Sequence, residues 1–215
     1  ALPAAAAPGR FELIHAGLVT PEFRDPRPLL CAVRDLLALP GVPRSAVRVT
    51  FLGGGAYLET DHFRSAVTEH GLDGVVEVAG RVTHRASLER QLASAVLVLL
   101  QASDDTTTLV PAKAFEYIRL GRPILSLTPA GATSEILRGV PMCEVVDPAR
   151  ADDLREAVVR LYRGWEGSPA ALRAPDAARQ FERSELAKQL ASILEEVSGP
   201  RTTGRDAGKG SQDAP

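Results

Sequence analysis

The stretch Ala95-Val96-Leu97-Val98-Leu99-Leu100 decides the fold class of this chain of 215 residues. It has the length of a β-strand and is apolar on both faces, which is typical of a strand buried in a parallel sheet. A polar loop follows over residues 103–108, and a helical pattern then runs from about Pro111 to Leu120, where Gly121 stops it. This order of strand, loop and helix predicts one repeating unit of a parallel sheet.

The same alternation of short apolar runs and amphipathic stretches continues on both sides of this unit. Further strands are predicted at 11–16, 47–52, 75–79, 123–127 and 142–146. Helices are predicted at 29–37, 58–70, 83–94 and 132–137, and two more at the C-terminal end are marked by Leu154, Leu161, Leu186 and Leu194. Because parallel neighbours need crossover helices, we expect an α/β, Rossmann-like, doubly wound six-stranded parallel sheet with helices on both faces and strand order 3-2-1-4-5-6.

The composition excludes several classes of function. The formal charge of −2 and the isoelectric point near 6.1 remove the electrostatic basis for a nucleic-acid partner. The longest apolar run, 95–100, is far shorter than the ~20 residues that span a bilayer. Two cysteines, Cys31 and Cys143, cannot form a disulfide framework, and they favour a reducing compartment, here the cytoplasm.

The two ends of the chain differ in composition from the middle. Residues 1–10 are rich in Ala and Pro and do not begin with Met, so we expect a disordered linker and a chain cut from a longer protein. Residues 11–197 are predicted to form one domain. Residues 198–215 are Gly-rich, polar and aperiodic, and we expect a disordered tail.

Ligands of open parallel sheets bind beyond the carboxyl ends of the strands, so the loops there hold the candidate residues. The loop 17–28 carries Gly17, Arg24 and Arg27 ahead of a helix, which suits a phosphate but also suits an ordinary solvated loop. The run Gly53-Gly54-Gly55 lacks the residues of a P-loop and of a dinucleotide fingerprint. It is interpreted as a tight turn at the ligand edge, which argues against a nicotinamide cofactor.

The strongest candidate site follows the strand at 95–100. The hydroxyls of Thr106, Thr107 and Thr108, the side chain of Lys113 and the start of a helix meet where a diphosphate would be stabilised. Glu116 lies one turn after Lys113, and its carboxylate could accept two hydrogen bonds from a ribose. An ordinary surface ion pair between Lys113 and Glu116 explains the same pattern, and the residues alone leave both interpretations open.

No metal site is predicted. The histidines show no ligand spacing, and the adjacent carboxylates Asp104 and Asp105 are typical of a solvated turn. His15 ends the first strand and could reach the ligand edge, but we expect a satisfied core or surface histidine there. The four histidines are His15, His62, His70 and His84.

These residues together resemble a known family. The run Val110-Pro111-Ala112-Lys113-Ala114-Phe115-Glu116-Tyr117-Ile118, followed by Gly121-Arg122-Pro123-Ile124-Leu125, resembles the P-x-K-x-F-E-Y…G-[KR]-P-[IV]-L signature of bacterial group 1 retaining glycosyltransferases with the GT-B fold. His15-Ala16-Gly17, Phe51-Leu52-Gly53 and Gly80-Arg81-Val82-Thr83-His84 are similar to other stretches of the C-terminal domain of these enzymes, in the right order.

The resemblance implies a nucleotide-sugar-binding site with a role for each residue. Glu116 would hold the donor ribose, the loop of Arg81, Val82 and Thr83 would flank the base, and Gly17 and Gly53 would line the donor. Contacts to the diphosphate and sugar would come from Thr106, Thr107, Thr108 and Leu109. Arg24 and Lys113 are the implied catalytic residues, because each would neutralise the leaving diphosphate. Many relatives carry a glutamate eight positions before the ribose-binding one, and this chain has Thr108 there.

The implied function is that of the donor-binding half of a hexosyltransferase of polysaccharide biosynthesis. It would transfer a sugar from a UDP- or GDP-sugar to a glycan or lipid acceptor, with no further cofactor. The acceptor-binding N-terminal domain would be missing, so we expect the isolated domain to be inactive, and any peripheral membrane association would run through that missing domain. Alternatives are a non-catalytic nucleotide-binding module and half of a sugar-nucleotide epimerase.

Overall fold

The computed structural model describes residues 9–102, 108–167 and 175–198. Two compact units divide the chain, one from Ala1 to Ala178 and one from Arg179 to Pro215. Most of the expected linker, the whole tail beyond Ser198, and loop residues Asp104, Asp105, Thr106 and Thr107 lie outside the described residues. The expected extent of the domain, 11–197, therefore stays a prediction.

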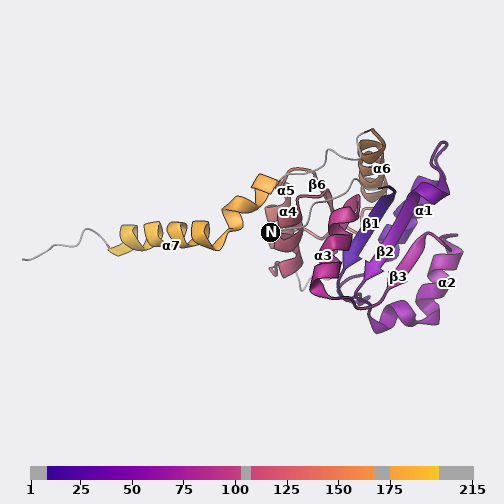
Figure 1. Cartoon of the computed structure of the whole chain (residues 1–215), viewed down its shortest axis with the longest axis horizontal. Helices are drawn as coiled ribbons and strands as arrows, with labels where there is room; N and C mark the ends of the chain where they lie inside the picture. Colours follow the sequence, from indigo (N-terminus) through magenta and orange to yellow (C-terminus); the bar gives the residue numbers. More distant parts are fainter. Residues whose placement is uncertain (1–8, 103–107, 168–174, 199–215) are drawn as a thin grey trace, which may run out of the picture. The chain divides into compact units, whose positions relative to one another are not determined.

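The first unit is built on a sheet of six parallel strands in the order β3-β2-β1-β4-β5-β6 (Figure 1). This confirms the predicted α/β fold and strand order. The strands are β1 (Phe11–Ala16), β2 (Val47–Leu52), β3 (Val76–Ala79), β4 (Val96–Leu100), β5 (Ile124–Leu127) and β6 (Cys143–Val146).

Helices connect successive strands, and Figure 1 shows α2 and α3 on opposite sides of β1, β2 and β3. None of the described helices is long and apolar enough to cross a membrane. The helices of this unit are α1 (Arg27–Leu37), α2 (Asp61–Glu69), α3 (His84–Ala93), α4 (Ala112–Leu120), α5 (Ala132–Arg138) and α6 (Ala151–Gly167). Short 3-10 turns are η1 (Arg44–Ala46) and η2 (Ala56–Glu59), and η4 (Pro175–Phe181) leads into the second unit.

Burial in the core explains why the sequences of the central strands are apolar. Every residue of β4 is buried, as expected for a strand that is covered on both faces. On one face α6 packs against α1, and the ring of Tyr162 meets the edge of Phe11 at a centroid distance of 5.3 Å. The hydrophobic contacts therefore tie the C-terminal helix of the unit to its first strand.

Capping residues set the ends of the helices. The hydroxyl of Thr83 accepts a hydrogen bond from the Ala86 amide at 3.2 Å, which confirms it as the N-cap of α3. The predicted helix over 58–70 is wrong at its start. Thr60 accepts from the Phe63 amide and begins α2 at Asp61, while the residues before it form the separate turn η2.

The second unit contains α7 (Arg183–Ser198), the second of the two predicted C-terminal helices. None of its described residues is buried. Its apolar side chains share helical spacing and are 47% to 82% exposed; they are Leu186, Leu190, Ile193, Leu194 and Val197.

We predict that Gly121→Ala lowers the free energy of unfolding by about 1 kcal/mol. Gly121 ends α4 in the left-handed region with φ 65°, where a Cβ is strained. Gly139 ends α5 at φ −82°, a conformation that alanine adopts freely, so Gly139→Ala is the matched control. Urea denaturation measures both, and equal destabilisation of the two variants would contradict the C-cap assignment.

Candidate functional site

The candidate site lies at the sheet edge formed by the carboxyl ends of the strands. The strand order reverses between β1 and β4, so the loops after these two strands flank the switch point where such sheets bind ligands. The Ala102 amide after β4 donates to the Phe23 carbonyl after β1 at 2.8 Å. The two loops are therefore held together directly across the switch point.

Glycines let the loops after β1 and β2 approach backbone to backbone. The Gly17 amide donates to the Leu52 carbonyl at 2.9 Å, and a Cβ on Gly53 would lie 3.4 Å from the Gly17 oxygen. A Cβ on Gly55, at φ 141°, would lie only 2.7 Å from the Val19 oxygen. Gly53 and Gly55 thus serve close packing at the ligand edge, while Gly54 adopts a positive φ of 83° in open space, as a tight turn requires.

Helix α4 is anchored to the end of β1 by a buried tyrosine. The hydroxyl of Tyr117, which is fully buried, accepts a hydrogen bond from the Ala16 amide at 3.1 Å. Burial raises the pKa of Tyr117 far above its usual value, so the group stays neutral. This contact brings the first turn of α4 beside the switch point.

Lys113 and Glu116 form an ion pair on that first turn. The Lys113 Nζ lies 2.7 Å from the Glu116 Oε1, and the two side chains are 34% and 25% exposed. This is the ordinary ion pair that was one of the two interpretations left open by the sequence. It also keeps a cation and a hydrogen-bond acceptor together at a helix N-terminus, where Pro111 provides no side-chain cap.

The two arginines of the loop after β1 have different environments. Arg27 is engaged by Asp25 through an ion pair of 2.7 Å, which also raises the Arg27 pKa. Arg24 is half-buried, and its guanidinium has no ion pair or hydrogen bond within the described part of the chain. Of the two arginines, Arg24, the predicted site residue, is the one whose charge is left uncompensated.

His15 lies at the end of β1 and is 4% exposed. Its Nδ1 lies 3.0 Å from the Val98 carbonyl of β4, while its Nε2 is buried without a hydrogen-bond partner among the described residues. Burial lowers its pKa to about 4, although the backbone groups of Val98 and Leu18 act in the opposite direction, and the charges of Arg24 and Lys113 lower it further. The expectation of a satisfied histidine is therefore wrong for one of its two nitrogens.

Besides burial, the lowered pKa of His15 reflects the charges of both predicted catalytic residues, Arg24 and Lys113. Arg24 comes from the loop after β1 and Lys113 from α4, and both act electrostatically on the same imidazole. Both cations are therefore near enough to the end of β1 to lower the pKa of His15.

The loop after β3 is exposed and carries Arg81, Val82 and Thr83. The Thr83 hydroxyl oxygen accepts the capping hydrogen bond, and its O–H remains able to donate to a ligand. Among the described residues, no hydrogen bond or ion pair joins Arg81, Val82 or Thr83 to the other predicted site residues.

The carbonyl of Leu109 is fixed by two side chains that the sequence analysis did not single out. Gln101 Nε2 donates to it at 3.0 Å and Thr133 Oγ1 donates at 2.9 Å. The Leu109 side chain is 55% exposed, and Thr108 is exposed beside it. Thr106 and Thr107, predicted with them, lie outside the described residues. Buried polar residues just after a strand end are the signal that could have identified Gln101.

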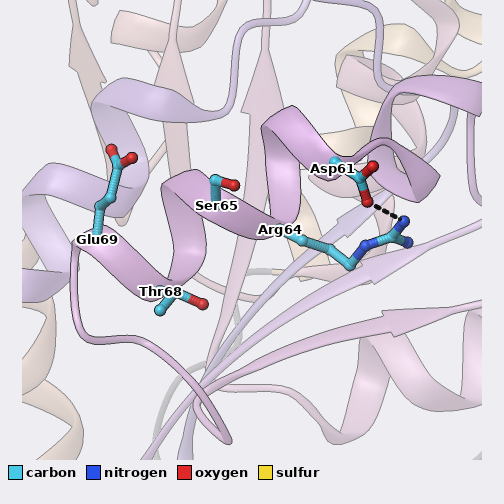
Figure 2. Close-up of a pocket in the computed structure, with 5 residues that line it drawn as sticks. All are labelled: Asp61, Arg64, Ser65, Thr68 and Glu69. Carbon is cyan, nitrogen blue, oxygen red and sulfur yellow. Dashed lines mark hydrogen bonds and ion pairs between the residues drawn. The ribbon is translucent and has the colours of Figure 1, made fainter.

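Figure 2 shows a different pocket, of about 410 Å³, along α2. All of its lining residues belong to one helix, and Asp61 and Arg64 within it pair with each other at 2.7 Å. Because no second element contributes a group, this pocket lacks the converging chemistry of the strand edge. Within the described ranges no three His, Cys, Asp or Glu side chains are grouped closely enough to hold a metal ion.

Comparison with known proteins reveals similar folds. No protein-family model and no curated protein matches the sequence. Among solved structures, Anabaena HepE in complex with UDP superposes with a TM-score of 0.64 at 17% identity, over 86% of this chain and 49% of that one. The pneumococcal O-GlcNAc transferase GtfA, in complex with UDP and GlcNAc, gives 0.60 at 18% identity, over 90% and 37%.

A glycosyltransferase from Rickettsia africae gives a TM-score of 0.63 at 14% identity, over 88% of this chain and 48% of that one. The chain has the fold of one part of such enzymes. It spans between 37% and 49% of the length of these three proteins. At these identities the similarity establishes the Rossmann-like fold, and the chemistry rests on the site residues.

We predict that His15 makes the protein less stable as the pH falls from about 6.5 to 4. In that window the unfolded chain binds a proton at His15, whereas the folded chain, with its pKa of about 4, does not. The shift of the pKa from 6.5 corresponds to a loss of at most about 3 kcal/mol of unfolding free energy. His15→Gln removes this part of the pH dependence, which urea denaturation at a series of pH values measures.

The control for this series is His62→Gln, which replaces an exposed histidine of α2. We expect this variant to keep the dependence of unfolding free energy on pH that the unchanged protein shows. If His15→Gln had the same slope as the unchanged protein, His15 would not be a buried neutral group.

Proposed function

We propose that the chain is the donor-binding half of a glycosyltransferase that uses a nucleoside-diphosphate sugar. The observation that carries this proposal is the convergence of Arg24 and Lys113 at the end of β1, beside Glu116 and the start of α4. UDP bound to Anabaena HepE and to pneumococcal GtfA supports the same class of ligand.

The proposed pose follows from the charges of the site. The diphosphate lies between the Arg24 guanidinium, the Lys113 ammonium and the amides at the start of α4. The ribose hydroxyls then donate to the Glu116 carboxylate in place of its bond to Lys113. The exposed loop of Arg81 to Thr83 borders the base, with UDP and GDP both compatible.

The proposed reaction is electrostatically assisted glycosyl transfer. The bond between the sugar C1 and the diphosphate oxygen breaks, an acceptor hydroxyl oxygen forms the new bond to C1, and that hydroxyl loses its proton. Arg24 and Lys113 stabilise the negative charge that develops on the departing diphosphate. Since the chain spans about half of the similar enzymes, we assign the acceptor site and the base to another domain and expect no transfer by this chain alone. Two unpaired cysteines, Cys31 and Cys143, support the cytoplasm as the compartment.

Substitution of Glu116 tests the ribose contact. We predict that Glu116→Ala weakens UDP binding at least about tenfold in calorimetry, because hydrogen bonds to a carboxylate contribute about 1.5–3 kcal/mol. Glu69→Ala, which removes an exposed glutamate of the α2 pocket, is the control and leaves the affinity unchanged. Unchanged UDP affinity of Glu116→Ala would refute the ribose assignment.

Comparison of UDP with uridine separates the diphosphate contacts from the ribose contact. We predict that Arg24→Ala weakens UDP binding about tenfold or more and leaves uridine binding unchanged, whereas Glu116→Ala weakens both. Chemical-shift titrations measure the weak uridine complex. The control Arg64→Ala, in α2, affects neither ligand. Equal loss of uridine and UDP binding in Arg24→Ala would contradict a diphosphate role for Arg24.

A further inference from the structure

The strongest unexplained feature of the site is the free nitrogen of His15. Because the Val98 carbonyl can only accept, Nδ1 of the neutral ring donates to it, and Nε2 carries the lone pair. That lone pair is buried without a partner among the described residues. The ring lies where β1 ends, and a Cβ on Gly17 would be 3.5 Å from Nε2. A side chain at position 17 would therefore begin in van der Waals contact with this nitrogen.

Each element that packs around His15 contributes a defined charge or none. The loop after β1 contributes Arg24, and α4 contributes Lys113 together with its partner Glu116. Strand β4 contributes the Val98 carbonyl, and the backbone of Leu18 in the loop after β1 also raises the pKa of the ring, although it makes no hydrogen bond to Nε2 of normal geometry.

Two uncharged groups complete the surroundings. Strand β2 presents the ring of Phe51, at a centroid distance of 6.4 Å from the imidazole. The hydroxyl of Tyr117 on α4 is engaged by the Ala16 amide. The charge balance around the imidazole is therefore positive in the empty site, which disfavours a further proton there.

A bound diphosphate reverses this balance. It brings two negative charges to Arg24 and Lys113, and it offsets the part of the pKa lowering that these two cations cause, while the larger effect of burial remains. A phosphate oxygen beside a lone pair is repelled, whereas a phosphate oxygen near an N–H⁺ group is attracted. The buried Nε2 is thus placed to take a proton at the moment the anion arrives.

Resting on the proposed function of the site, we infer that His15 is a third anion-binding group, which takes up one proton at Nε2 when the diphosphate of a nucleotide sugar binds. The proton comes from the solvent, the ring changes from neutral to a charge of +1, and no covalent bond of the ligand changes. The site consequently gains a cation only when it is filled.

Calorimetry with UDP-glucose tests this inference. UDP-glucose is the probe because its diphosphate is esterified at both ends, whereas the terminal phosphate of UDP titrates near pH 6 and would add its own protons. The binding enthalpy is measured at pH 5.5 in two buffers that differ in ionisation enthalpy. The difference between the two enthalpies gives the number of protons taken up on binding, which we expect to lie between zero and one. The affinity then rises by up to tenfold for each pH unit as the pH falls from 7 toward 5.

Substitutions of histidine identify the group that takes up the proton. His15→Gln abolishes the uptake and the pH dependence of the affinity, while His62→Gln, at an exposed position of α2, retains both. Uptake that persists in His15→Gln would overturn the inference, because another group would then carry the proton.

A second measurement needs no variant at His15. The ring-carbon shift of His15 in the histidine-labelled, otherwise unchanged protein reports its titration directly, and it should move to a higher pH when UDP-glucose saturates the site. Binding without any such shift overturns the role of His15 and leaves the proposed function standing. A protein that does not bind UDP-glucose at all overturns both.

Discussion

One buried hydrogen bond, from the Ala16 amide to the Tyr117 hydroxyl, fixes the part of the structure on which the site depends. It joins the last residue of β1 to the middle of α4, two elements far apart in the sequence. The first turn of α4 therefore lies beside the switch point, where the strand order reverses. Together with the buried side chains of α4, this contact holds Lys113 and Glu116 beside that point.

The second property of the site is an excess of positive charge that the described residues do not neutralise. Arg27 is paired with Asp25, and Lys113 shares its charge with Glu116, but Arg24 has no acidic partner in the described part of the chain. A half-buried cation without a carboxylate, next to a buried neutral imidazole, is a poor arrangement for stability and a good one for an anion. The residues that cost stability in the empty protein are thus the ones to which we assign the proposed binding of a diphosphate.

The sequence predicted the fold well because its signals are local. The apolar run of β4 and the glycine after α4 each determine their own element, and the alternation of strands and helices requires a parallel sheet. The error in the predicted start of α2 has a local cause as well, because Thr60 acts as an N-cap and begins the helix at Asp61.

The site was less predictable because its contacts are not local. That His15 meets Val98, and that Gln101 and Thr133 share the Leu109 carbonyl, depends on strand order and cannot be derived from spacing.

The most direct measurement is a crystal structure of the protein with UDP. We expect the diphosphate oxygens to lie within hydrogen-bond distance of Arg24 and Lys113, and the ribose hydroxyls to contact Glu116 near the start of α4. UDP bound elsewhere, for example in the α2 pocket, or a diphosphate pointing away from both cations, would contradict it.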